Sequence, residues 1–304
     1  MIHIFSALIP VFSLILIGYF FKKIKFPSHE FWPQADKLTY YVLMPSLLVY
    51  KLSTASLDSE NSFGFVASAL LAILFTMIIL IIINKIIPST PSAFTSMVQG
   101  AIRFNTYVFL ALSASIFGNE GLVYSAIILT FAIPFINILC ISIFAIYITN
   151  DKLNFLYLLK SIITNPLIVA CVVGGSINFL GIHLPVVLNN TLEILSKAAL
   201  PMGLLSVGFG LVIKEIKSSK SEVIISSLGK HLIFPILIFL FGKFFGIDGM
   251  MLSILVLFGV LPTAPSSFIL ARQLGGDVGL MSSIITVQTL LSIVCILLVL
   301  HYFI

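Results

Sequence analysis

The feature that most constrains the fold is a series of apolar runs that repeats along the whole chain. The 304 residues are 60% hydrophobic and only 9% charged, whereas an average soluble domain carries about 25% charged residues. A run of about 20 apolar residues is long enough to cross the hydrocarbon core of a bilayer as a helix. The sequence therefore predicts an all-α, multi-pass protein of the cell (plasma) membrane.

Ten such runs can be delimited, and most are separated by short connections that contain the turn residues Gly, Pro, Asn or Ser. No connection is long enough to hold a soluble domain. The expected transmembrane spans are 2–21, 36–52, 62–84, 92–117, 122–148, 161–180, 186–213, 222–245, 249–273 and 278–301.

The distribution of Lys and Arg among the loops predicts the orientation of these spans. The loops after spans one, three, five, seven and nine contain Lys22, Lys23, Lys25, Lys85, Lys152, Lys214, Lys217, Lys220 and Arg272. The opposite loops hold little beyond Lys51 and Lys243 at helix ends. By the positive-inside rule, both termini are then extracytoplasmic. The net charge of +5 reflects these cytoplasmic cations and gives no sign of nucleic-acid binding.

The two halves of the chain share a pattern of Pro, Gly and polar residues. At a shift of 156 positions the matched pairs are Pro10 with Pro166, Gly18 with Gly174, and Pro45 with Pro201. At a shift of 157 they are Asn105 with Pro262, Thr106 with Thr263, Gly118 with Gly275, and Glu120 with Asp277. Chance recurrence of Pro and Gly is the alternative, and the constant shift argues against it. Because five spans is an odd number, the pattern predicts two inverted five-helix repeats, 1–150 and 151–304.

Spans four and nine each carry helix-breaking or polar residues near the middle. Span four contains Arg103 and Asn105, and span nine contains Pro262 and Pro265. Each proline removes a hydrogen bond from the helix, and broken backbone at membrane depth is tolerated where it lines a cavity or is buried in protein. Interrupted helices in matching positions of two repeats indicate a transporter binding site. We therefore expect spans four and nine to be broken and to cross.

The residues at these breaks favour binding of an anion. The second half of each broken helix would begin near Thr106 and near 263–266, and a helix N-terminus offers unpaired N–H groups and partial positive charge. Asn, Thr and Ser are helix-capping residues, and Arg103 adds a full charge with a fork that fits a carboxylate. The predicted substrate-binding residues are Arg103, Asn105, Thr106, Pro262, Thr263, Pro265, Ser266 and Ser267, with Asn137, Gln288 and Glu193 as further candidates.

Several of these residues have a structural explanation as well. Arg103 would be a structural lock if it paired with Glu193, although Lys197 is the helical neighbour of Glu193 at i+4. Asn137 and Gln288 fit a role in hydrogen bonding between helices as well as one in lining a cavity.

The sequence leaves the coupling ion open and predicts no other cofactor. Lys230 and His231, near the inner end of span eight, are a pair that could titrate, and a lysine that snorkels to the interface explains them equally well. The three cysteines lack paired spacing and predict no metal site. Few groups in the spans titrate near neutrality, which argues against a dedicated proton relay, while freed carbonyls at the breaks would suit Na⁺.

These motifs resemble the auxin efflux carrier family along the whole chain. Arg103-Phe104-Asn105-Thr106 with Gly118-Asn119-Glu120-Gly121 is similar to its fourth span. Leu261-Pro-Thr-Ala-Pro-Ser-Ser267 with Gly275-Gly276-Asp277 is similar to its ninth, and Leu200-Pro-Met-Gly-Leu-Leu205 to its seventh. The chain lacks the long central loop of the plant exporters and resembles the compact bacterial members. Plant exporters carry a Pro-Asn pair at both crossings, which this chain does not.

The resemblance implies ten helices in two inverted repeats, with crossed helices and elevator-like alternating access. It also implies a small organic anion as substrate: auxin in plants, and malate or malonate for bacterial members. We therefore expect a secondary transporter, with an anion channel or facilitator at the same site as the alternative. An enzyme is not expected, because Gly275-Gly276-Asp277 lacks the second carboxylate that dyad chemistry needs. The expected partners are the anion, the lipid bilayer and, as one oligomeric option, a second copy in a homodimer.

Overall fold

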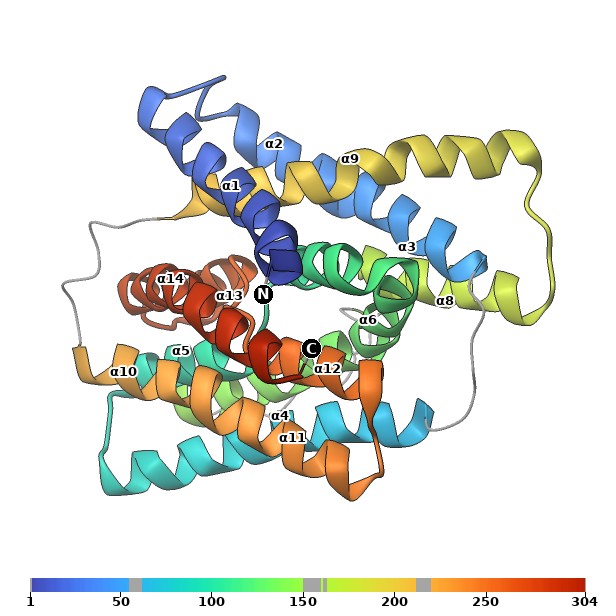
Figure 1. Cartoon of the computed structure of the whole chain (residues 1–304). Helices are drawn as coiled ribbons and strands as arrows, with labels where there is room; N and C mark the ends of the chain where they lie inside the picture. The colour runs from blue at the N-terminus through green and yellow to red at the C-terminus, as the bar shows by residue number, and fades with distance from the viewer. Residues whose placement is uncertain (1, 55–61, 150–159, 161–162, 212–219, 304) are drawn as a thin grey trace. The chain divides into compact units, whose positions relative to one another are not determined.

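The computed structural model describes residues 2–54, 62–149, 160, 163–211 and 220–303 (Figure 1). All regular secondary structure in these ranges is helical, which confirms the all-α prediction. Five helical segments are long and apolar enough to cross a membrane, judged by length and composition, and two shorter apolar helices accompany them. The five are Ser62–Ile86, Pro91–Ile148, Val186–Gly210, Ser221–Phe244 and Val278–Tyr302.

The chain forms two compact units, and each of them draws on both halves of the sequence. Unit 1 comprises Met1–Ser59, Leu110–Ile133 and Leu156–Gly210, and unit 2 comprises Glu60–Phe109, Pro134–Phe155 and Leu211–Ile304. The units therefore divide the chain differently from the sequence repeats 1–150 and 151–304, and each repeat contributes to both units.

Unit 1 is built on close contacts between helix backbones. Its helical elements are α1 (Ile2–Ile24), α2 (Phe31–Leu38), η1 (Thr39–Leu43), α3 (Met44–Ser53), α8 (Pro166–Phe179), α9 (Val186–Gly210) and the middle of α6 (Thr106–Phe144). Helix α1 packs along α9, and α3 packs against both α8 and α9 (Figure 1). A Cβ atom added to Gly208 of α9 would lie 1.8 Å from the carbonyl oxygen of Ile15 in α1. Glycine is therefore what allows α1 and α9 to touch.

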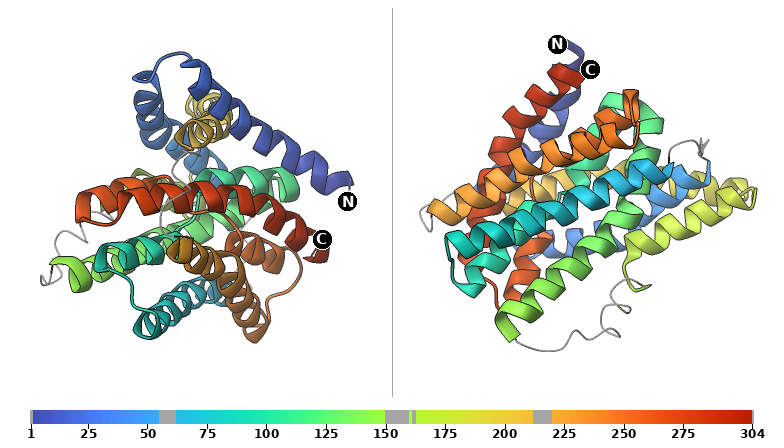
Figure 2. Two further views of the ribbon diagram at one scale, coloured as in Figure 1. Left: turned by 90° about the vertical axis from the view of Figure 1, so that its left-hand side faces the viewer. Right: turned by 90° about the horizontal axis from the view of Figure 1, so that it is seen from below.

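Unit 2 contains the remaining helices and both ends of α6. Its elements are α4 (Ser62–Ile86), α5 (Pro91–Ile102), η2 (Ala145–Thr149), α10 (Lys220–Leu228), η4 (Gly229–Ile233), α11 (Phe234–Phe244), α12 (Gly249–Gly259), α13 (Ser266–Leu274) and α14 (Val278–Phe303). Helix α4 packs along α11, and α5 packs against α10 and α14 (Figure 2). An apolar cluster around Met97, Met281 and Ile284 joins α5 to α14. This packing holds the short helices α5 and α13 in place.

Two helices of the fold contain a π-helical turn immediately before a proline. The turn η1 ends two residues before Pro45, and η4 ends two residues before Pro235. Proline lacks the N–H of a regular helix and its ring clashes with the carbonyl of residue i−4, so a wider turn accommodates it without ending the helix.

The boundary predicted between spans four and five coincides with a kink in the structure. The sequence predicted a connection around 118–121, and α6 consists of two helices joined at Gly118, which departs from helical geometry with φ 65° and ψ −148°. Glycine adopts positive φ without steric cost, which allows a sharp kink at a single residue. Gly275, its partner at a shift of 157, also has positive φ, 84°, and ends α13.

Candidate functional site

The first helix interruption separates α5 from α6, as the sequence predicted. Helix α5 ends at Ile102, and Arg103 and Asn105 have extended backbone angles before α6 begins at Thr106. The side-chain oxygen Oδ1 of Asn105 accepts hydrogen bonds from the backbone N–H groups of Tyr107 and Val108, at 3.1 and 3.2 Å. Asn105 is thus the N-cap of α6, satisfying two N–H groups that its first turn would otherwise leave unpaired.

The second interruption separates α12, which ends at Gly259, from α13, which begins at Ser266. Its capping differs from the prediction, because the N-cap is Pro265, which makes no side-chain cap bond. Thr263 is of a residue type that caps helices, but its hydroxyl lies within hydrogen-bonding distance of the Gln99 carbonyl oxygen, at 3.4 Å, and of the Ser267 hydroxyl, at 3.3 Å. The reason is tertiary: α5 brings the Gln99 carbonyl, which also accepts from the backbone N–H of Arg103, within reach of the Thr263 hydroxyl.

The two interruptions meet inside unit 2. The backbone N–H of Asn105 donates to the carbonyl oxygen of Pro262 at 2.8 Å. The backbone N–H of Thr263 donates to Oε1 of Gln288 in α14, at 3.2 Å. If the two repeats were equivalent at a shift of 157, a matching bond would run from the backbone nitrogen of Pro262 to the carbonyl oxygen of Asn105. That bond cannot form, because proline has no N–H to donate. We refer to residues 103–105 and 260–265 together as the paired interruption.

The guanidinium of Arg103 lies at the edge of the paired interruption. It donates to Oδ1 of Asn137 in α6 and to the hydroxyl of Ser266 at the start of α13, both at 3.2 Å. The thiol of Cys140, one turn after Asn137, lies beside it. Within the described ranges Arg103 makes no salt bridge, and the expected alternative partner, Glu193, pairs with Lys197 at 2.9 Å. The guanidinium is therefore hydrogen-bonded to neutral side chains, and the alternative salt bridge between Arg103 and Glu193 is not formed.

Several buried polar atoms around the paired interruption have no hydrogen-bond partner among the described residues. They are Nε of Arg103, Nδ2 of Asn105, and both side-chain polar atoms of Gln99. Asn105 is 1% exposed and Gln99 is fully buried. Buried polar groups in native proteins are nearly always paired, so these atoms are candidates for contact with a polar ligand or ordered water.

Gln99 is a candidate that the list of predicted residues omitted. The sequence did contain a signal for it, because Gln99 is an amide within an apolar run, four residues before Arg103. In a continuous helix that spacing would place Gln99 and Arg103 on the same face. The other predicted residues of spans four and nine lie in or next to the paired interruption. Gln288 braces it from α14, and Asn137 meets Arg103. Glu193 is the exception: it belongs to unit 1 and is half-exposed on α9, where it pairs with Lys197.

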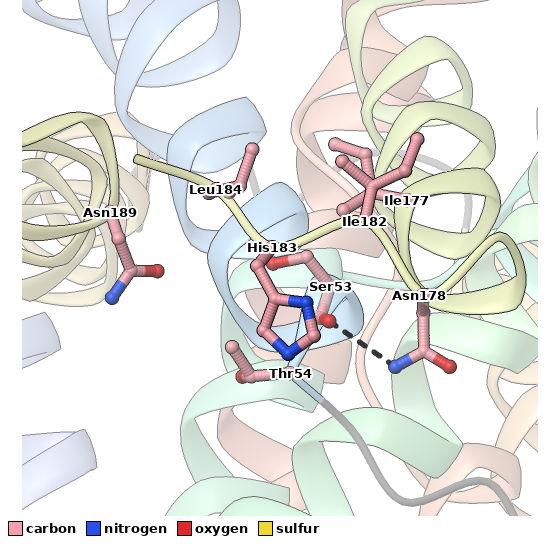
Figure 3. A pocket seen from close by; sticks show the side chains of 9 residues that line it. Ser53, Thr54, Ile177, Asn178, Ile182, His183, Leu184 and Asn189 are labelled. Carbon is pink, nitrogen blue, oxygen red and sulfur yellow. Dashed lines mark hydrogen bonds between the residues drawn. The ribbon is translucent and has the colours of Figure 1, made fainter. Parts of the chain in front are cut away.

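A pocket of about 370 Å³ lies elsewhere, in unit 1, between the ends of α3 and α8 and the start of α9 (Figure 3). Asn178 of α8 donates to the carbonyl oxygen of Ser53 at its wall, at 3.3 Å. The ring of His183 is exposed beside it. None of the predicted site residues lines this pocket, and it offers no cluster of buried unpaired groups.

The paired interruption has the chemistry of an anion site. The first turns of α6 and α13 place backbone N–H groups there, which carry partial positive charge. The Arg103 fork supplies a full charge and further donors. No Asp or Glu of the described residues pairs with it. A carboxylate would satisfy these donors, whereas nothing here provides the activated nucleophile or carboxylate pair of a hydrolase.

The interrupted helices and their buried donors define a membrane transport protein rather than an enzyme, and the comparisons with known proteins agree. The chain belongs to the family described as Membrane transport protein, whose model matches residues 3–300. This confirms the resemblance inferred from the motifs of spans four, seven and nine. The chain is also 22% identical to a protein of Rhizobium meliloti (strain 1021) named "Putative malonate transporter", over 96% of this chain and 93% of that protein.

Proposed function

We propose that this protein is a secondary transporter that moves a small dicarboxylate, such as malonate or malate, by alternating access at the paired interruption. The observation that carries the proposal is the environment of Arg103. Its guanidinium donates to the neutral side chains of Asn137 and Ser266, and its Nε is buried without a hydrogen-bond partner among the described residues. A charged side chain at the centre of a membrane helix costs at least about 2.5 kcal/mol on insertion scales. Binding of a carboxylate would offset that cost. The name of the Rhizobium relative is consistent with this substrate class.

Contacts inside unit 1 support the ten-span, inverted-repeat arrangement that belongs to this proposal. A Cβ on Gly18 of α1 would lie 2.0 Å from the carbonyl oxygen of Leu205 in α9. A Cβ on Gly174 of α8 would lie 3.0 Å from the Cα of Val49 in α3. Adding 156 to positions 18 and 49 gives positions 174 and 205. The α1–α9 contact is therefore repeated as the α8–α3 contact, as two related halves would require. The proposed orientation places both termini outside the cytoplasm of the cell.

Binding and counterflow together test the proposed function. Purified protein should melt at a higher temperature in malonate than in chloride at the same ionic strength, because a ligand that binds only the folded state stabilises it. The same titration with and without Na⁺ tests the open question of the coupling ion.

In proteoliposomes loaded with malonate, a carrier accelerates uptake of labelled malonate by counterflow, whereas a channel does not. Binding without counterflow would favour the channel alternative, and no stabilisation by any small carboxylate would contradict the site itself.

Asn105 allows its structural role to be separated from its proposed ligand contact. Asn165 caps α8 in unit 1 with the same geometry, since its Oδ1 accepts from the backbone N–H groups of Leu167 and Ile168. Replacing either asparagine with alanine should cost about 0.5–2 kcal/mol of stability. Only Asn105→Ala should also weaken malonate binding, because only Asn105 has a buried Nδ2 donor left over beside Arg103. Melting temperature and malonate affinity measured on both variants check this, and equal affinities would place Asn105 outside the site.

A further inference from the structure

Gln99 of α5 is a fully buried glutamine whose side-chain amide is unpaired. Neither its Oε1 nor its Nε2 forms a hydrogen bond among the described residues. Gln288 of α14 is equally buried, but its Oε1 accepts from the backbone N–H of Thr263, and its Nε2 donates to the hydroxyl of Ser226 at 3.5 Å. A buried glutamine that braces unit 2 is thus paired at both ends of its amide, and Gln99 does not have that role.

The packing of α5 holds Gln99 in this position. The hydroxyl of Ser96 donates to the carbonyl oxygen of Asp277, just before α14, at 3.0 Å. A Cβ on Gly100 would lie 2.3 Å from the hydroxyl oxygen of Ser226 in α10. Because these contacts lie on either side of Gln99 along the helix, α5 cannot turn to bring the amide to a partner without breaking them.

Gln99 and Arg103 leave α5 on the same face. The backbone N–H of Arg103 donates to the carbonyl oxygen of Gln99 at 2.9 Å, and the φ of Arg103 is −75°. Helical geometry therefore extends to the Cβ of Arg103, and only its ψ, 156°, departs from the helix. Side chains four residues apart on a helix are neighbours, with Cβ atoms about 5–6 Å apart. The amide of Gln99 thus flanks the side chain that carries the buried, unpaired Nε.

The unpaired atoms around the paired interruption include an acceptor as well as donors. Nε of Arg103, Nδ2 of Asn105 and Nε2 of Gln99 donate hydrogen bonds, whereas Oε1 of Gln99 accepts them. A carboxylate has acceptors only, so it would satisfy the donors and leave Oε1 of Gln99 without a partner. A neutral carboxyl group or a carboxamide carries a donor beside its carbonyl oxygen and can pair with both atoms of the glutamine amide.

The charge of the paired interruption favours the same kind of ligand. Residues 103–105 and 260–265 contain one charged side chain, that of Arg103, and the hydrogen-bond partners of its guanidinium are neutral. One carboxylate matches that charge. A second carboxylate beside Gln99 would be buried without a cation, and an unpaired buried charge is far more costly than a neutral group that is hydrogen-bonded.

We propose that Gln99 determines substrate specificity by binding a neutral group, with a donor and an acceptor, at the far end from the carboxylate that Arg103 holds. The preferred ligand is then a monoanion. It is either a dicarboxylic acid with one carboxyl group still protonated or a carboxylate that carries a carboxamide. This inference rests on the proposed function and narrows its substrate class from a dicarboxylate to the singly charged form.

Three ligands of the same size, malonate, malonamate and acetoacetate, test the proposal on the purified full-length protein at neutral pH. Malonamate and acetoacetate carry the same single charge and differ in one group, because the amide nitrogen of malonamate is a methyl group in acetoacetate. Malonate is mostly doubly charged at this pH. Malonamate should bind most tightly. Acetoacetate should bind about tenfold more weakly or worse, because its ketone leaves Oε1 of Gln99 without a donor.

Gln99→Met removes both amide atoms and keeps an unbranched side chain of similar length. In this variant malonamate and acetoacetate should bind with equal affinity. Its melting temperature without ligand should not fall, because no hydrogen bond of the described residues is lost. Gln273, exposed in α13, is the matched control, and Gln273→Met should keep the wild-type ratio of the two affinities. That ratio is the readout because a purely structural effect changes both affinities alike.

Each contrary result has a distinct meaning. Equal wild-type affinities for malonamate and acetoacetate, or a ratio that persists in Gln99→Met, would overturn the role of Gln99 and leave its amide to ordered water. Malonate binding as tightly as malonamate, or more tightly, would overturn it because the dianion would then be the ligand. These results leave the proposed transport function intact, whereas a wild-type protein that binds none of the three ligands contradicts that function itself. The wild-type affinities decide the matter even if Gln99→Met fails to fold.

Discussion

Replacing Arg103 with glutamine should weaken malonate binding by about 30-fold or more, because losing one charged hydrogen-bond partner of a buried anion costs roughly 2–5 kcal/mol. The folded state should survive the change. Among the described residues Arg103 meets neutral side chains, those of Asn137, Ser266 and Cys140, so no described acid is left unpaired. Malonate affinity and the melting temperature without malonate, measured on the same preparation, check both expectations.

Two further variants make the Arg103 result specific. Arg272, the second of the two arginines in the chain, lies exposed in the last turn of α13, and Arg272→Gln should leave affinity unchanged. Arg103→Lys should restore part of the affinity, because a point charge replaces the bidentate fork. Wild-type affinity in a stable Arg103→Gln protein would mean that the helix N-termini alone hold the anion.

Replacing Gly208 with alanine should be among the most destabilising single changes in unit 1. The added methyl group would lie 1.8 Å from the carbonyl oxygen of Ile15, which is backbone and cannot rotate away, so α1 and α9 must separate. Overpacking of this kind costs about 1–3 kcal/mol, occasionally more. The measurement is the melting temperature of the purified protein, together with the fraction that stays monodisperse.

A matched substitution controls for the change from glycine to alanine itself. Gly175 lies within α8 of the same unit, and a Cβ there would meet no atom within 4 Å. Gly175→Ala should therefore raise stability by about 0.5–1 kcal/mol, since alanine favours the helix over glycine. Equal melting temperatures for the two variants would mean that α1 and α9 do not pack as closely as described. Neither change touches the paired interruption, so malonate affinity of the folded protein should not differ.

The sequence alone determined the class of fold and the position of the breaks. Apolar runs of membrane-crossing length leave helices as the expected spanning structure, because backbone groups in lipid must be hydrogen-bonded within the segment or a closed barrel. Asn105, a helix-capping residue before Thr106, marked the start of α6 to the residue. The prolines of span nine, together with Ser266, likewise marked the start of α13. These are local effects, and local chemistry is visible in the order of residues.

The tertiary structure alone decided which side chains share the site and which remain unpaired. The hydroxyl of Thr263 turned to the Gln99 carbonyl of another helix instead of capping its own. Lys230 became buried against Phe234 and Phe258, although its sequence context fitted a snorkelling lysine equally well. Whether a polar atom finds a partner depends on helices that are distant in sequence and on how closely they pack, which no local pattern encodes. The sequence identified the residues at the breaks, and the packing of other helices around them determined which of their donors lack a hydrogen-bond partner.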